Sequence, residues 1–144
     1  GAWSSDVCYS DLEPGLLPGS LNGVLAQRLV RRLCTGCRRR EDPRECSSHM
    51  GLSGSIGTGA LVWRPMGCPS CGNSGYRGRM ALFEFLPVGQ AIRELIPTRP
   101  SATQVARLAR EHGMIPMRQR AQEAIDRGDT SPEEVVNVMG TPEA

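Results

Sequence analysis

The residues best suited to chemistry are two CxxC pairs, Cys34–Cys37 and Cys68–Cys71, with thirty residues between them. The two-residue spacing lets both thiolates of a pair face one ion from a tight turn, and two such turns complete a tetrahedral site. We therefore predict a zinc site with the ligands Cys34, Cys37, Cys68 and Cys71. Four protein ligands leave no position for water, so this zinc should be structural. The alternatives are a redox CxxC and a degenerate site that no longer holds metal.

Other cysteines and histidines are weaker candidate ligands. Cys46 and His49 have CxxH spacing but lie in a stretch rich in serine and glycine, and four cysteines already complete a zinc site. Whether either residue touches the metal stays open at this point. Cys8 lies in residues 1–11, which show no periodicity. We interpret that segment as a foreign or disordered tail.

Composition excludes several classes of function. All 17 basic residues are arginine, and without lysine neither a GxxxxGK[ST] phosphate loop nor a lysine Schiff base is possible. We therefore predict no catalytic residue and no nucleotide-binding residue in the chain. A net charge of +2 and an aromatic content of 4% argue against a zinc ribbon that binds nucleic acid. A chaperone-type cysteine-rich module is a further alternative, because residues 68–75 approach CxxCxGxG, although Asn73 occupies the first glycine position.

The chain has no feature typical of a membrane or secreted protein. No run of apolar residues approaches the 18 or so that a membrane-spanning helix requires. The N-terminus lacks the basic start and apolar run of a signal peptide. These observations favour a cytoplasmic protein.

The first CxxC pair follows a segment with apparent helical periodicity. Apolar residues recur at steps of three and four between residues 21 and 33, which predicts a helix that delivers Cys34 at its end and begins after an N-cap at Ser20. On its polar side we expect either a solvated face or a docking surface, formed by Arg28, Arg31 and Arg32.

The rest of the pattern predicts a short sheet and several helices. Residues 38–59 should form a flexible loop, residues 60–64 a short strand and residues 79–86 an apolar strand. Helices are expected around residues 92–96, after a capping box at Ser101, from Met117 to Gly128, and after Ser131. The predicted fold class is α+β and mainly helical, with a tetracysteine zinc subdomain and a short sheet followed by a C-terminal helical bundle.

Three segments together carry a resemblance to a known family. They are LNGVLAQRLVRRLC at residues 21–34, GCPSC at residues 67–71 and GYRGR at residues 75–79. Their combination resembles the C-terminal region of the secretion ATPase superfamily, in particular the type II secretion ATPase or the related type IV pilus assembly ATPase. Between these two the sequence leaves the choice open. The sequence departs from the family at residues 38–59 and at Gly89 and Gln90, where an acidic pair is common.

The resemblance implies a fragment of a larger motor. Residues 12–33 would end a RecA-like ATPase domain, residues 34–78 would form the zinc-binding subdomain, and residues 79–140 would form a strand and the helical subdomain. ATP and Mg²⁺ would bind only in the full-length parent, a hexamer whose Walker motifs lie upstream. Expected partners are the neighbouring ATPase subunits and the inner-membrane secretion platform. The location would be the cytoplasmic face of the inner membrane, reached only through partners.

Overall fold

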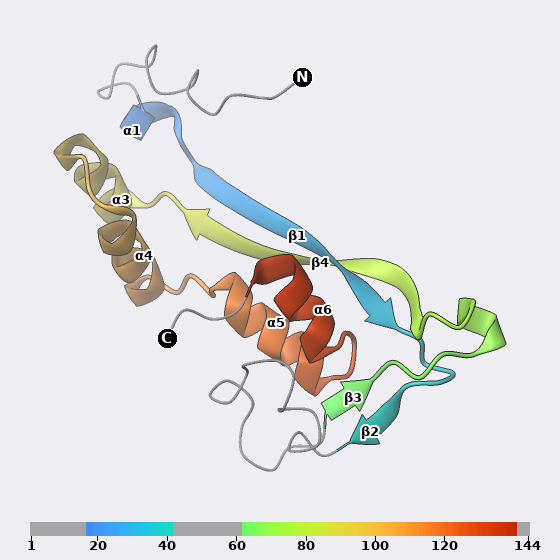
Figure 1. The fold of residues 1–144 in the computed structure, drawn as a ribbon. Helices are drawn as coiled ribbons and strands as arrows, with labels where there is room; N and C mark the ends of the chain where they lie inside the picture. Colours follow the sequence, from blue (N-terminus) through green and yellow to red (C-terminus); the bar gives the residue numbers. More distant parts are fainter. Residues whose placement is uncertain (1–16, 42–61, 141–144) are drawn as a thin grey trace. The chain divides into compact units, whose positions relative to one another are not determined.

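The computed structural model describes residues 17–41 and 62–140, which belong to two compact units (Figure 1). One unit comprises residues 1–26 and 84–115, and the other comprises residues 27–83 and 116–144. Helices and short sheets together confirm the α+β class. The expected C-terminal helical bundle is not confirmed, because the helices after the last strand are divided between the units. Within the described ranges, no helix has the length and apolar character needed to span a membrane.

The longest strands are β1 (Gly23–Leu33) and β4 (Tyr76–Pro87), which pair with each other and run in opposite directions (Figure 1). The predicted strand over residues 79–86 is confirmed and extends further in both directions. The predicted helix over residues 21–33 is wrong. Its apolar face would have included Val24, Leu25 and Leu29, yet these side chains are exposed in the strand. Residues 23–33 form a strand because they pair with β4, about fifty residues away, and local periodicity carries no sign of such a partner.

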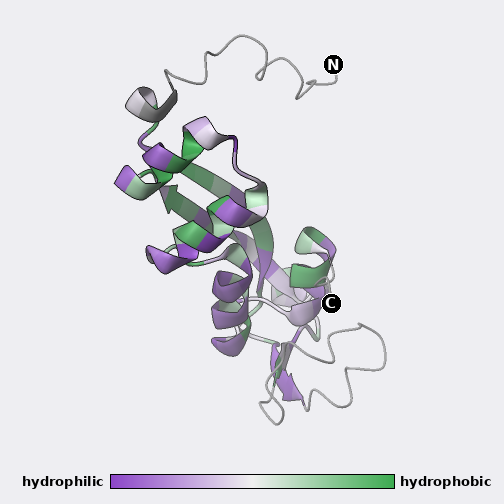
Figure 2. Ribbon diagram, turned by 90° about the vertical axis from the view of Figure 1, so that its left-hand side faces the viewer, coloured by the Kyte–Doolittle hydropathy of each residue, from purple (hydrophilic) through white to green (hydrophobic). Residues whose placement is uncertain are grey.

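The core of the second unit lies between its part of this sheet and the helix α5 (Met117–Asp126). Val30 of β1 and Leu82 of β4 are almost fully buried against Ala121 and Ala124. The small alanine side chains let the helix backbone approach the sheet closely, so a two-stranded sheet has a packed face. Figure 2 colours much of the β1–β4 ribbon hydrophobic. Partly buried side chains from β4, α5 and α6 (Pro132–Met139) complete the cluster: Met80, Met117, Val135, Val138 and Met139.

A second small sheet follows the first cysteine pair. β2 (Arg39–Glu41) pairs antiparallel with β3 (Val62–Arg64), with Arg40 opposite Trp63. The start of the predicted loop over residues 38–59 is therefore a strand, because its backbone has a partner in β3. The predicted strand over residues 60–64 is confirmed for residues 62–64. The rest of the predicted loop lies outside the described residues, as do Cys8, Cys46, His49 and the predicted tail at residues 1–11.

The first unit holds three short helical elements after β4. They are α3 (Gln90–Leu95), a 3-10 turn (Ile96–Thr98) and α4 (Ala102–Glu111). The predicted capping box is confirmed: the Ser101 hydroxyl accepts from the Gln104 amide at 3.3 Å, and the Gln104 side chain accepts from the Ser101 amide at 2.8 Å. Ile92, Val88 and Ala109 are buried in this unit. Ser20 does not cap a helix, because it is the last residue of α1 (Leu17–Ser20).

The helices α5 and α6 of the second unit agree with their predicted boundaries. α5 ends before Gly128, which has a φ of +72°. α6 begins with Pro132 after Ser131, whose hydroxyl accepts from the Glu134 amide at 3.3 Å. The buried loop between the helices includes Thr130 and Ser131, both fully buried, and this loop is where α6 meets β1.

Candidate metal centre

The first cysteine pair lies in the turn directly after β1. The Cys34 carbonyl accepts from the amides of Cys37 at 3.2 Å and Arg38 at 2.9 Å, which closes the turn and places both thiols on its inner side. The Cys34 amide in turn donates to the Gly75 carbonyl at 2.9 Å. This bond joins the turn to the segment that carries the second pair.

The second pair flanks the 3-10 turn η3 (Pro69–Cys71): Cys68 is its N-cap and Cys71 is its last residue. The Cys68 carbonyl accepts from the amides of Cys71 at 3.1 Å and Asn73 at 2.9 Å. Gly72 and Asn73 both have a φ of +60°, so the chain reverses in the left-handed region just after Cys71. The reversal brings Gly75 close to Pro65, and a Cβ atom at Gly75 would overlap the proline ring. Glycine is required there both by its φ of +75° and by this close approach.

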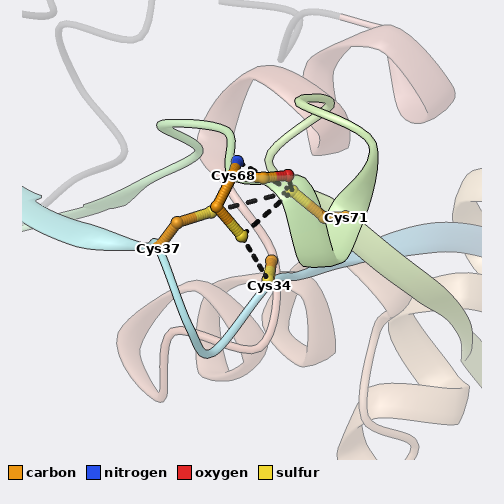
Figure 3. Close-up of side chains that lie close together, drawn as sticks. All are labelled: Cys34, Cys37, Cys68 and Cys71. Carbon is orange, nitrogen blue, oxygen red and sulfur yellow. Dashed lines mark hydrogen bonds between the residues drawn. The ribbon is translucent and has the colours of Figure 1, made fainter.

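The structure brings all four predicted thiols together (Figure 3). Their Sγ atoms lie within 4.8 Å of one another. Cys34 to Cys68 and Cys37 to Cys71 are both 3.9 Å, and Cys68 to Cys71 is 3.7 Å. These distances exclude a disulfide, in which the sulfur atoms would be about 2.05 Å apart. With Zn–S bonds of about 2.3 Å, the edges of a regular tetrahedron measure about 3.8 Å. The arrangement therefore fits a tetrahedral metal ion.

Cys37 and Cys71 differ in proton affinity, because Cys71 accepts more hydrogen bonds that stabilise a thiolate. The Cys71 sulfur accepts from the amides of Cys68 at 3.2 Å and Gly75 at 3.3 Å. Burial alone would raise the pKa of Cys71, but these amides and the neighbouring thiols outweigh it and lower that pKa to about 6. Burial raises the pKa of Cys37 to about 11, although a hydrogen bond with the Gly67 backbone opposes the rise. Binding of a metal to all four sulfurs would release the proton held by Cys37.

The arginines after Cys37 contact an aromatic ring. The guanidinium carbon atoms of Arg38 and Arg40 lie 4.3 Å and 4.8 Å from the ring centre of Trp63. Arg38 also donates to the Gly128 carbonyl, next to the place where a Cβ atom would overlap the same indole ring. Through these cation–π contacts and the bond from Arg38 to Gly128, the two arginines fix β2 and β3 against the end of α5.

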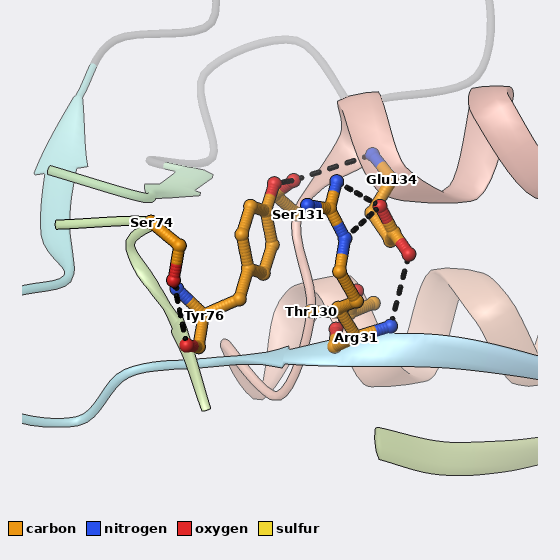
Figure 4. Close-up of polar contacts among 6 residues, drawn as sticks. All are labelled: Arg31, Ser74, Tyr76, Thr130, Ser131 and Glu134. Atoms are coloured by element: carbon orange, nitrogen blue, oxygen red, sulfur yellow. Dashed lines mark hydrogen bonds and ion pairs between the residues drawn. The ribbon is translucent and has the colours of Figure 1, made fainter. Parts of the chain in front are cut away.

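A cluster of polar contacts that the sequence did not predict joins β1 to the start of α6 (Figure 4). The Glu134 carboxylate accepts from the Arg31 amide at 3.0 Å, from Arg31 Nε at 2.8 Å and from Arg31 Nη2 at 2.5 Å. The Arg31 guanidinium also lies 4.1 Å from the ring centre of Tyr76, and the Tyr76 hydroxyl bonds to Ser131 Oγ at 2.8 Å. Thr130 Oγ1 donates to the Arg31 carbonyl at 2.9 Å. We call Arg31, Tyr76, Thr130, Ser131 and Glu134 the strand–helix clamp.

Two of the three arginines predicted to form a docking or solvated face, Arg31 and Arg32, contact acidic side chains in the structure. Arg31 is a structural residue, since it makes three hydrogen bonds to one buried carboxylate. Arg32 is only 55% exposed and lies 3.7 Å from Asp129. The sequence signal for the contact of Arg31 is the acidic pair Glu133 and Glu134 in the first turn of α6, a position where carboxylates also favour the helix dipole. Glu134 is the second residue of that pair and lies 103 positions from Arg31 in the chain.

Comparison with known proteins finds a family match and several similar proteins, and these matches include the segments around the cysteines. The family model described as "Type II/IV secretion system protein" matches residues 11–137. The chain belongs to this family. It is 38% identical over 127 residues to the type II secretion system protein E of Aeromonas hydrophila, a match that covers 88% of this chain and 25% of that protein. It is 40% identical over 127 residues to the type IV pilus assembly ATPase PilB of Thermus thermophilus, covering 87% of this chain and 14% of that protein.

A third relative leads to the same conclusion. The type II secretion system protein HxcR of Pseudomonas aeruginosa is 38% identical over 127 residues, covering 88% of this chain and 23% of that protein. The chain thus spans a quarter or less of the length of these three relatives. The resemblance noted from the sequence is confirmed at the level of the family. Similar identities to type II and type IV proteins do not separate the two systems.

Proposed function

We propose that this chain is the zinc-bearing C-terminal part of an ATPase that drives assembly of a type II secretion pseudopilus or a type IV pilus. The observation that carries the proposal is the match over residues 11–137 to proteins whose names state type II secretion and type IV pilus assembly. In this proposal residues 12–33 end the ATPase domain, residues 34–78 form the zinc subdomain, and residues 79–140 form the strand and helical part. ATP and Mg²⁺ bind elsewhere in the parent.

The metal is zinc in this proposal, and its ligands are Cys34, Cys37, Cys68 and Cys71. Sulfur separations of 3.7–3.9 Å support the assignment, because they match the edges of a zinc tetrathiolate. When bound, the ion supplies a crosslink between two turns and no reaction. The amides of Cys68 and Gly75 that donate to Cys71 hold the second turn in a form ready for metal. The zinc subdomain then serves as a rigid part through which the ATPase contacts neighbouring subunits and the inner-membrane platform.

Zinc content tests the metal assignment directly. Inductively coupled plasma mass spectrometry of the chain, purified without chelator, should find one zinc per chain. Cys34→Ser and Cys68→Ser should lose the metal. Cys8→Ser and Cys46→Ser are matched controls and should retain it. A folded wild-type chain without zinc contradicts the assignment, and loss of zinc in Cys46→Ser shows that the ligand set is different.

A chimera tests the cellular function. Residues 11–137 of this chain would replace the matching segment of the Aeromonas hydrophila protein E, in cells that lack their own protein E. A parallel chimera would be made with the Thermus thermophilus PilB. We expect one chimera to restore protein secretion or piliation, and the system restored identifies the parent. Cys34→Ser should abolish the rescue, whereas Cys46→Ser should not. Stable, zinc-loaded chimeras that restore neither process would contradict the proposed function.

A further inference from the structure

A polar cavity lies beside the first cysteine turn, wholly within the unit formed by residues 27–83 and 116–144. Its volume is about 210 Å³. Charged and hydroxyl side chains dominate the lining, and Leu33 is its only apolar side chain. The polar members come from the end of β1, the cysteine turn, the start of β4 and the loop after α5: Arg32, Thr35, Arg38, Arg77 and Asp129.

The lining carries more positive than negative charge. Three of the lining residues are arginine and only one, Asp129, is acidic. The Asp129 carboxylate is shared between two arginines, because it lies 3.7 Å from Arg32 and accepts a hydrogen bond from Arg127 Nε at 2.9 Å. It therefore offsets little of the charge of Arg32. Neither Arg38 nor Arg77 has an acidic partner within residues 17–41 and 62–140.

The arginines also differ in how far they are fixed. Arg38 is half-buried, lies over the Trp63 ring and donates to the Gly128 carbonyl, so its guanidinium group is held in place beside the cavity. Arg77 is exposed and no contact in the described part of the chain occupies its guanidinium group. A fixed donor and an uncommitted donor beside the Thr35 hydroxyl form a site that is ready to accept an oxyanion without breaking existing ion pairs.

We propose that this cavity binds a phosphate group, as inorganic phosphate or as a phosphomonoester. Guanidinium groups match the oxygen atoms of phosphate in geometry as well as in charge, and the threonine hydroxyl adds a donor. The volume accommodates a phosphate but is below the roughly 300–1,000 Å³ of pockets that enclose drug-sized ligands. With a single apolar side chain in the lining, the cavity offers no slot for a nucleotide base. This site is separate from the proposed zinc centre and extends the function proposed above.

Binding of inorganic phosphate to the purified chain tests the proposal. Isothermal titration calorimetry would be run at constant ionic strength, with chloride replacing phosphate in the reference. We expect one site per chain. Arg77→Gln should weaken phosphate binding about tenfold, which is the usual effect of one charge-assisted hydrogen bond. Arg79→Gln is the matched control, because Arg79 is an exposed arginine on the same strand and does not line the cavity.

Vesicle binding separates the two sources of the phosphate group. Co-sedimentation with phosphatidylcholine vesicles containing phosphatidic acid would be compared with phosphatidylcholine alone. Binding of inorganic phosphate that depends on Arg77 supports a soluble ligand, and binding of phosphatidic acid that depends on Arg77 supports a lipid headgroup. The proposal is overturned if neither probe binds, or if Arg79→Gln weakens binding as much as Arg77→Gln. Zinc content and circular dichroism of each variant exclude loss of the fold as the cause.

Discussion

Substitution of Glu134 measures how much the strand–helix clamp stabilises the second unit. The side chain is almost fully buried and accepts three hydrogen bonds from Arg31, one of them from the backbone amide. The Arg31 side chain is 47% exposed, so solvent reduces the ion-pair contribution to roughly 0.5–1 kcal/mol. Loss of the acceptor for the Arg31 amide adds about 1–2 kcal/mol. Glu134→Gln, which keeps an acceptor oxygen, should therefore cost about 1 kcal/mol, and Glu134→Met about 2–3 kcal/mol.

Urea unfolding followed by circular dichroism provides the free energies. Glu123→Gln is the matched control, because Glu123 pairs with Arg120 at 3.5 Å in the same unit but both side chains are more than one third exposed. Its cost should remain below about 0.5 kcal/mol. If Glu134→Met is no more destabilising than Glu123→Gln, the clamp does not stabilise the fold and the reasoning from burial is refuted.

The same pair predicts a dependence on pH. Burial raises the pKa of Glu134, but the hydrogen bonds from the Arg31 side chain and amide outweigh it, so the folded-state pKa is lowered. A carboxyl group with a lowered folded-state pKa stabilises the fold fully above its unfolded-state pKa, about 4.3, and loses this contribution as the pH falls through the folded-state value. The stability difference between wild type and Glu134→Gln should therefore narrow below pH ~4. A difference that stays constant from neutral to acidic pH would contradict the assignment.

Three further predictions concern the neighbourhood of the cysteines. Removal of metal with a chelator should lower the melting temperature, because structural zinc contributes on the order of 10 kcal/mol to small modules, and added zinc should restore it. Gly128→Ala should cost at least ~2 kcal/mol, from its φ of +72° and the overlap with Trp63, whereas Gly72→Ala, in the left-handed helical region with a φ of +60° and open space around it, should cost only ~1 kcal/mol in the same unfolding assay. Tyr76→Phe should cost about 1 kcal/mol for the lost bond to Ser131. Because burial raises the pKa of Tyr76, wild type should lose stability faster than this variant above pH ~10.

The sequence predicts correctly those parts of the fold that depend on interactions between residues close together in the chain. Ser101 and Ser131 cap α4 and α6 because a short side chain reaches an amide three residues later, and Gly128 ends α5 in a conformation that few other residues adopt. The cysteine cluster is predictable for a similar reason, since CxxC spacing fixes the local turn. The metal itself stays a prediction.

The parts that the sequence did not predict depend on distant partners. Residues 23–33 contain apolar residues at helical spacing, but they pair with β4 as a strand, and only Val30 and Leu33 of β1 are buried. Residues 39–41 form a strand because residues 62–64 lie beside them. The pairing of Arg31 with Glu134 spans most of the chain. No window of ten or fifteen residues contains the information for these contacts.

The exclusive use of arginine has a structural consequence around the cysteine cluster. The Arg31 guanidinium group binds both Glu134 and the face of Tyr76, while Arg38 and Arg40 both lie over Trp63. A lysine ammonium group has no planar surface for stacking and no pair of parallel donors for a carboxylate, so it could not make both contacts at once. The composition that excludes a phosphate-loop lysine therefore also provides flat cations, each with several hydrogen-bond donors. These cations hold β1, β2 and β3 in the positions from which the first cysteine pair faces the second.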